Sequence, residues 1–130
     1  PCSGTGTMRR HPEIPWRLVS SDIEDGLPKL QLQLLREAAR RVKPGGELIY
    51  ATCSVLMAEN EQVLDAFLQT EQGLAFEVAP LHAAFAFQKE PAVVDYLRAH
   101  EDERGLFQSF PFKPEDFDGH FCVRLIRRKA

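Results

Sequence analysis

Two cysteines stand in short turns of small polar residues, where a thiol is able to act as a nucleophile. Cys2 lies in Pro1-Cys2-Ser3-Gly4-Thr5-Gly6, and Cys53 lies in Ala51-Thr52-Cys53-Ser54. Cys53 follows an apolar run of strand length, and ligands of open α/β sheets bind outside the carboxyl ends of strands. A helix is expected a few residues later, and its N-terminus lowers a thiol pKa where the geometry points that way. Spacing alone leaves two interpretations of Cys53 open, a packed small residue or a nucleophile.

A third cysteine, Cys122, makes the number odd, and the three lie far apart in the sequence. No CxxC pair and no nearby pair of histidines has the spacing of a zinc site, so the sequence predicts no metal centre. Three cysteines at this density are also not typical of a disulfide framework. We therefore expect reduced thiols in a cytoplasmic protein, with Cys122 packed within a strand.

An α/β pattern is expected to position the two thiol turns. Residues 1–26 are interrupted by glycine and proline and predict irregular structure. Apolar residues at three- and four-residue spacing, among them Leu30 and Leu34, predict a helix over residues 27–42. The elements expected after it are a strand over 47–53, a helix over 59–70, a strand over 74–79, a short helix over 93–98 and a strand over 120–126. This alternation predicts a partly parallel sheet, and the unbroken apolar run at 47–53 predicts a strand covered on both faces.

Length and composition narrow the class of protein. The chain has 130 residues, enough for one compact domain, and is 44% hydrophobic and 27% charged, as ordinary soluble proteins are. No apolar run approaches the roughly 20 residues that span a bilayer, so we expect no membrane partner. A net charge of -3 argues against a wholesale basic nucleic-acid binder. Basic residues near both chain ends would form one local anion-binding patch if the fold brings the ends together.

The two thiol turns and their surroundings resemble the RNA cytosine-5 methyltransferases of the RsmB/Sun-like family. Residues 1–6, followed by Arg9-Arg10-His11-Pro12-Glu13 and Trp16-Arg17, are similar to the fourth motif of that family. The sixth motif is matched by Tyr50-Ala51-Thr52-Cys53-Ser54 and Glu59-Asn60-Glu61, and the closing strand by Asp118-Gly119-His120-Phe121 and Arg124-Leu125. The resemblance covers most of residues 1–70 and 117–126.

The resemblance implies a fold and a reaction. The fold is a partial, three-layer, Rossmann-like methyltransferase fold, in which residues 1–130 form a single partial domain from the C-terminal half of the catalytic domain. The reaction is formation of 5-methylcytosine in rRNA or tRNA, with S-adenosylmethionine as the donor. Cytosine C5 is too weak a nucleophile to be methylated directly, and a thiolate added to C6 makes it reactive. By resemblance, Cys53 is the attacking thiolate, and Cys2 assists breakdown of the adduct and release of RNA.

The same resemblance gives the expected RNA contacts, which are Pro1, Ser3, Arg9, Arg10, Trp16 and Arg17. The arginines are suited to phosphates, and the glycines of the Cys2 turn let the backbone approach a flipped-out base. Trp16 either stacks on a base or anchors the loop as a buried side chain. Glu59-Asn60-Glu61 is interpreted as scaffold, because acidic residues are favoured in the first turn of a helix.

The sequence also departs from the family pattern. Nothing precedes Pro1 in place of the aspartate and alanine of the family, and Gln108-Ser109-Phe110-Pro111 replaces its Arg-x-x-Pro-His. The glycine-rich loop and acidic residue of the donor site lie upstream in the family, so the cofactor-binding residues are unknown. We therefore expect residues 1–130 alone to be inactive and to bind the donor weakly, and either to self-associate or to leave residues 1–26 poorly ordered. The alternative function is a non-catalytic RNA-binding or partner-binding remnant, and a third is a thiol redox protein that uses Cys2 and Cys53.

Overall fold

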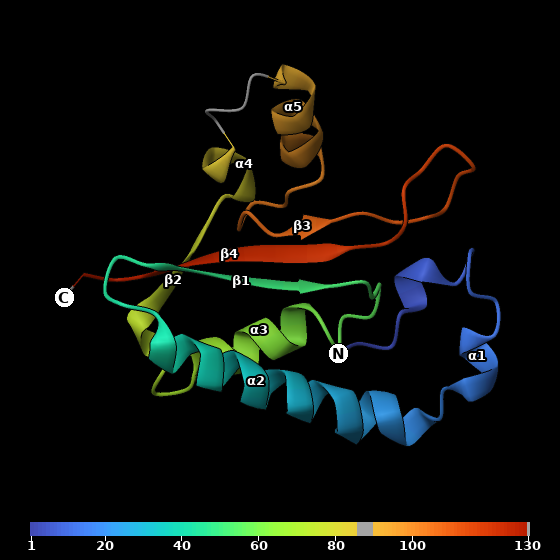
Figure 1. The fold of residues 1–130 in the computed structure, drawn as a ribbon, viewed down its shortest axis with the longest axis horizontal. Helices are drawn as coiled ribbons and strands as arrows, with labels where there is room; N and C mark the ends of the chain where they lie inside the picture. Colours follow the sequence, from blue (N-terminus) through green and yellow to red (C-terminus); the bar gives the residue numbers. More distant parts are fainter. Residues whose placement is uncertain (86–89, 130) are drawn as a thin grey trace.

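The computed structural model describes residues 1–85 and 90–129, and its centre is a small sheet (Figure 1). The strands are β1 (Glu47–Thr52), β2 (Phe76–Ala79), β3 (Phe107–Gln108) and β4 (Phe121–Arg127). Their order is β1-β4-β2, and β3 also pairs with β4. Every hydrogen-bonded strand pair among the described residues is antiparallel, so the prediction of a partly parallel sheet was wrong. β4 lies between β1 and β2 and is antiparallel to both.

Helices lie on both sides of this sheet, which makes three layers (Figure 1). On one side are α2 (Leu27–Arg41) and α3 (Glu61–Leu68), and on the other are α4 (Leu81–Ala84) and α5 (Pro91–Ala99). Residues 1–26 form short helical turns rather than irregular chain: η1 (Thr5–Thr7), α1 (Ile14–Arg17) and η2 (Asp22–Gly26), and a further turn, η3 (Gly73–Ala75), precedes β2. The largest apolar side chains that are fully buried come from α3 and β4: Phe67, Phe121, Leu64, Leu125 and Val123.

α2 forms where its sequence predicts a helix, but it is rotated relative to the expected inward face. Pro28 lies in its first turn, where a missing N–H costs nothing, and Arg40 and Arg41 occupy its last turn. The buried stripe contains Gln31 together with two apolar residues of the same face. Leu30 and Leu34, which the spacing places inward, are 42% and 46% exposed. A polar side chain from α2 is thereby directed into the interior of the unit.

β1 is an edge strand, and its carboxyl end leads directly to Cys53. Tyr50 and Thr52 are buried on the side of α2 and α3, whereas Ile49 on the opposite face is 50% exposed. The prediction of a strand covered on both faces was therefore wrong, because only one helical layer covers β1. No helix in the part of the chain that the structure describes is long and apolar enough to cross a membrane.

Candidate active site

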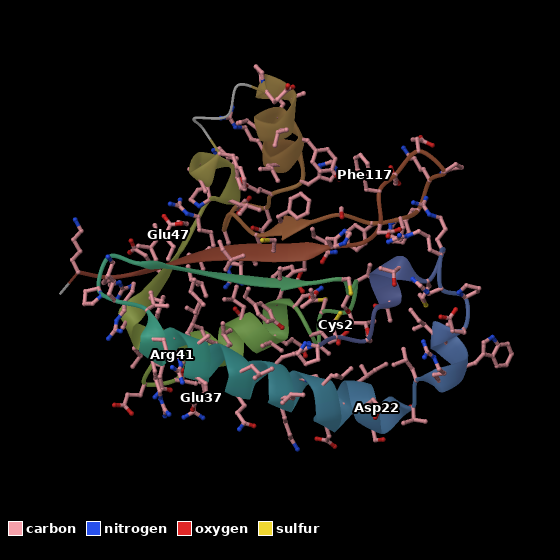
Figure 2. The ribbon with its side chains drawn as sticks, viewed as in Figure 1. Cys2, Asp22, Glu37, Arg41, Glu47 and Phe117 are labelled. Atoms are coloured by element: carbon pink, nitrogen blue, oxygen red, sulfur yellow. The ribbon has the colours of Figure 1, made fainter. Side chains whose placement is uncertain are left out.

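The two thiols, 51 positions apart in the sequence, meet at the carboxyl end of β1. Cys2 lies before the η1 turn, Cys53 directly follows β1, and their Sγ atoms are 2.8 Å apart. Both thiols are free and partly exposed. Figure 2 shows Cys2 just beyond the end of β1, at the place where Figure 1 marks the N-terminus. The structure thus brings the two sequence-predicted thiols into one site.

The turns that carry the thiols are joined through a glycine. The Gly6 N–H donates to the Cys53 carbonyl at 2.9 Å, and the Gly119 N–H donates to the Gly6 carbonyl at 2.8 Å. A Cβ atom on Gly6 would lie 1.9 Å from the Gly119 carbonyl oxygen and 2.9 Å from that of Cys53. Three segments therefore pack backbone against backbone at a point that admits no side chain.

A buried carboxylate, Glu59, lies behind the thiols and connects the same turns. Its side chain has no exposed surface. One oxygen accepts hydrogen bonds from the Ser3 N–H at 2.7 Å and the Gln31 amide at 3.0 Å. The other oxygen accepts from the Ser3 hydroxyl at 2.6 Å and from the Ser54 hydroxyl. α3 begins only at Glu61, so the interpretation of Glu59 as an acid in a first helical turn was wrong.

Asn60 fixes the end of β1 from the neighbouring position. Its side-chain oxygen accepts from the Thr52 hydroxyl at 2.5 Å, and its amide donates to the Ser54 carbonyl at 2.9 Å and to the Gln108 side chain at 3.1 Å. The Tyr50 hydroxyl donates to the Glu59 carbonyl at 2.5 Å. These bonds hold the residues on both sides of Cys53, so the thiol is carried by a rigid turn.

The surroundings of Cys53 favour its neutral form. Burial, hydrogen bonding to Cys2 and the negative charge of Glu59 together raise the pKa of the Cys53 thiol to about 11. The lowering of this pKa expected from a nearby helix N-terminus is not found, because α3 begins eight residues further along and desolvation outweighs any helix effect. The thiol thus needs a proton acceptor or a bound substrate to become a thiolate at neutral pH.

The rate of Cys53 alkylation by iodoacetamide is expected to keep rising with pH up to about pH 11, because the pKa of this thiol is raised to about 11. A thiol with the ordinary pKa of 9 would reach its maximum rate near pH 9. Only the thiolate reacts, so at pH 8 Cys53 should react ~100-fold more slowly than a thiol with an ordinary pKa. Peptide mapping by mass spectrometry measures each cysteine separately, and the chain unfolded in urea is the control. A plateau near pH 9 in the folded chain contradicts the prediction.

Some of the expected RNA-binding residues already bind other groups of the protein. Arg9 donates to the carbonyls of Lys113 and Asp116 at 3.0 and 2.6 Å, and Arg10 pairs with Asp118. The first two arginines therefore fasten the loop that leads to β4. Trp16 is 90% exposed, which excludes its interpretation as a buried anchor.

The remaining expected contacts lie on either side of the thiols. Arg17 is exposed, and its guanidinium Nη2 lies 3.5 Å from Oε1 of Glu13. The Pro1 carbonyl accepts from the Gln31 amide at 2.9 Å, and Ser3 is buried against Glu59. The two basic chain ends do not form a single patch, because the C-terminus lies at the opposite end of the sheet (Figure 1). Within residues 1–85 and 90–129, no three His, Cys, Asp or Glu side chains are grouped as metal ligands.

Sequence reasoning missed Gln31 and Gly119 as parts of this site and assigned Glu59 to the scaffold alone. A usable signal was present for Gln31 and for Gly119. Gln31 is a polar residue four positions before a core leucine of the same helix, and buried polar groups require partners. Gly119 follows Asp118 in the stretch that matches the closing motif, and a glycine there leaves room for a close backbone approach.

Comparison with known proteins places this site in a family. The profile of the family described as 16S rRNA methyltransferase RsmB/F matches residues 1–122. Ribosomal RNA small subunit methyltransferase B of Klebsiella pneumoniae (strain 342) is 35% identical over 129 residues, which are 99% of this chain and 25% of that protein. The protein of the same name from Salmonella arizonae is 54% identical over 69 residues, 53% of this chain and 16% of its own. The chain thus spans about a quarter of the length of the first of these relatives.

Solved structures agree with the sequence comparison. The crystal structure of PH0851 matches with a TM-score of 0.70 and 34% identity, over 96% of this chain and 24% of that one. A methyltransferase homologue from Pyrococcus horikoshii matches with a TM-score of 0.63 and 25% identity, over 98% of this chain and 36% of its own. These likenesses confirm the expected α/β, partial Rossmann-like methyltransferase fold. With a family profile that matches residues 1–122 and a thiol pair where the two cysteine motifs predict one, this chain belongs to the RsmB/F family of 16S rRNA methyltransferases.

Proposed function

We propose that residues 1–130 supply the nucleophile of an RNA cytosine-5 methyltransferase that acts on ribosomal RNA. The observation that carries this proposal is the 2.8 Å contact between Cys2 and Cys53 at the carboxyl end of β1, in a chain of the RsmB/F family. The names of the relatives favour small-subunit rRNA over tRNA as the substrate. Both thiols must stay reduced for this chemistry, which supports the expected cytoplasmic location.

In the proposed reaction, the Cys53 thiol loses its proton to solvent water, and the thiolate sulfur bonds to C6 of a flipped-out cytosine. The electron pair of the C5–C6 double bond moves to C5, which becomes the nucleophile for the methyl group that S-adenosylmethionine would supply, with S-adenosylhomocysteine as the leaving product. Loss of the C5 proton to solvent water then restores the double bond and expels Cys53 as a thiolate. Cys2, whose Sγ lies 2.8 Å away, is placed to donate a hydrogen bond to that departing thiolate. In this proposal the two thiols serve different steps, attack by Cys53 and release by Cys2.

S-adenosylmethionine is the expected methyl donor, but the groove beside Pro1 does not fit it. A groove of about 230 Å³ lies beside Pro1, between α2 and β1. Its lining is apolar or neutral, with Leu34 and Ile49 among the residues that form it and no carboxylate to hold a ribose. We therefore assign no residue of this chain to the donor and expect residues outside this sequence to bind it.

Residues 1–130 alone are expected to bind S-adenosylmethionine weakly, with a dissociation constant no tighter than about 1 mM, or about 4 kcal/mol of binding free energy. Isothermal titration calorimetry measures this directly, with S-adenosylhomocysteine as a second ligand. Micromolar binding would show that this chain contains a donor site and would contradict the assignment.

The proposed RNA contacts are exposed groups of residues 1–26, the segment that also carries Cys2. Trp16 is free to stack on a base, and Arg17 and the exposed part of Arg10 are free to approach phosphates. Arg9 is proposed to act indirectly, by holding the 113–116 segment through the two carbonyls that it contacts.

A covalent adduct tests the proposed function. RNA that carries 5-azacytosine accepts a thiolate at C6 without waiting for methyl transfer, so an adduct forms even where no donor is bound. The expected result is a mass increase equal to one RNA molecule, mapped to the peptide that contains Cys53. The same RNA with ordinary cytosine is the control. RNA binding without any adduct would instead support a non-catalytic remnant.

The 2.8 Å contact also favours a second candidate, a redox-active thiol pair. Oxidised glutathione supplies the oxidant: one cysteine thiolate attacks it and releases one glutathione thiolate, and the other cysteine then displaces the second. The product is a Cys2–Cys53 disulfide and two molecules of reduced glutathione. A reversible disulfide in a chain that shows no affinity for RNA would favour this candidate over the methyltransferase.

A further inference from the structure

We propose that Glu59 is the positioning residue of the thiol pair, because its buried carboxylate holds the Cys2 turn against the Cys53 turn. The purpose of this arrangement rests on the proposed function, in which both thiols act on the same cytosine ring. The geometry and its test do not depend on RNA. Glu59 does not contact the thiols through a hydrogen bond and acts through their sequence neighbours.

The hydrogen bonds of Glu59 reach the neighbours of both thiols. Ser3, which follows Cys2, donates both its N–H and its hydroxyl to the carboxylate, at 2.7 and 2.6 Å. Ser54, which follows Cys53, donates its hydroxyl to the same oxygen that the Ser3 hydroxyl contacts. A single rigid group thereby fixes the position following each cysteine. The two turns are also linked by the Gly6 N–H, which donates to the Cys53 carbonyl, and by the contact between the two thiols. The Thr5 hydroxyl adds contacts with the Ser54 hydroxyl at 3.1 Å and the Val55 N–H at 3.2 Å.

Burying the Glu59 carboxylate costs free energy. All four donors to Glu59 are neutral, and a buried charge without a cationic partner is expensive. Gln31 directs its amide nitrogen to Glu59 and to the Pro1 carbonyl, which leaves its own buried oxygen without a hydrogen-bond partner. An apolar side chain of similar size would pack these turns without either cost. The carboxylate therefore serves the thiol site rather than general stability.

A carboxylate at this position also acts on the thiols by its charge. The negative charge of Glu59 contributes to the raised pKa of Cys53, after burial and the contact with Cys2. Glutamine at position 59 is able to keep the hydrogen bonds, because its oxygen accepts from the two N–H donors and its NH₂ faces two hydroxyls that are able to accept. Glu59→Gln thus removes the charge alone, whereas Glu59→Ala removes the charge and the hydrogen bonds.

The first measurement is the equilibrium of the Cys2–Cys53 disulfide in glutathione buffers, which reports how closely the thiols are held. It is made in a Cys122→Ala background, so that no third thiol competes. Glu59→Ala is expected to lower the effective concentration of the two thiols at least 10-fold, and Glu59→Gln is expected to restore it to within about threefold of the parent chain. Glu61→Gln, which removes a charge two positions away, is the matched control and is expected to leave the value unchanged.

The second measurement is the pH profile of Cys53 alkylation in a Cys2→Ala background, which a merely structural role would not change. Glu59→Gln is expected to move the midpoint to lower pH, because the like charge that opposes thiolate formation is gone. Glu61→Gln is expected to leave the midpoint in place. An unchanged midpoint in Glu59→Gln overturns the electrostatic part of the proposal.

An effective thiol concentration in folded Glu59→Ala within twofold of the parent overturns the positioning role. If circular dichroism shows that Glu59→Ala is unfolded, Ser3→Ala replaces it, because this variant removes one hydroxyl donor and keeps the carboxylate. Ser3→Ala is expected to lower the effective concentration about threefold, and no change in that variant overturns the role. If the parent chain forms no RNA adduct but the Glu59 variants change the disulfide equilibrium and the alkylation midpoint as expected, the proposed function alone is refuted. If the adduct forms but the Glu59 variants change neither thiol measurement, the role of Glu59 alone is refuted.

Discussion

Cys53→Ala is expected to abolish the covalent adduct with 5-azacytosine RNA and to lower methylation by the enzyme roughly 10⁴-fold or more, the scale of loss when a covalent nucleophile is removed. The reason is chemical rather than structural. Alanine keeps the turn at the end of β1, whose hydrogen bonds come from Thr52, Ser54 and Asn60. It removes only the atom that is proposed to bond to C6, and Cys2 belongs to a different turn. Mass spectrometry of the protein–RNA mixture measures the adduct.

Two other cysteine variants separate this effect from a general loss of thiols. Cys122→Ala is expected to retain the adduct, because Cys122 lies on β4 and not in the thiol turns. Cys2→Ala is expected to retain the adduct with 5-azacytosine and, in methylation assays with ordinary cytosine, to prolong the life of the protein–RNA complex. An adduct that survives in Cys53→Ala and disappears in Cys2→Ala would reverse the proposed roles.

Gly6→Ala is expected to lower the free energy of unfolding by about 3 kcal/mol and to separate the thiols. The added Cβ atom would lie 1.9 Å from the Gly119 carbonyl oxygen, and backbone atoms cannot rotate away as a flexible side chain does. The clash is relieved only if the Cys2 turn moves away from Cys53, or if the segment around Gly119, just before β4, moves away from both thiol turns. Urea denaturation measures the stability, and the glutathione equilibrium of the Cys2–Cys53 disulfide measures the separation.

Gly26→Ala is the matched control for that substitution. A Cβ atom there meets nothing closer than the Ser21 carbonyl oxygen at 3.6 Å, an ordinary contact. Gly26 lies in a helical turn without a positive φ, so alanine should change the stability by no more than about 1 kcal/mol. Equal destabilisation by the two substitutions would show that the close approach at Gly6 is not special.

The elements were predictable from the sequence where local periodicity is strong. α2, α3, β1 and β4 occur within one or two residues of the expected ranges, because apolar spacing is a local signal. The strand order was not predictable in this way. β4 pairs with residues of β2 that lie 45–51 positions earlier in the chain and with residues of β1 that lie 69–79 positions earlier, and no local pattern reports that choice. The inward face of α2 was also misjudged, since it depends on what Gln31 meets across the interior.

The site was predictable to the extent that it consists of cysteines in recognisable turns. Cys2 and Cys53 came from motif resemblance, and the structure places them in contact. Arg9 and Arg10 were expected to face RNA, and they instead bind the loop before β4 because it passes within reach of both guanidinium groups. The role of Glu59 could not be inferred, since a carboxylate just before a helix has an adequate local explanation. Its partners become visible only when three distant segments are assembled.

The central position of β4 has a consequence for biosynthesis. β1 and β2 have no pairing partner in the described chain other than β4, residues 121–127, which is synthesised after both. While this segment is being translated, both earlier strands wait with open backbone groups, which exposes the nascent chain to aggregation. A premature stop codon before residue 121 would therefore remove the middle of the sheet, and with it the support for every strand that had already emerged.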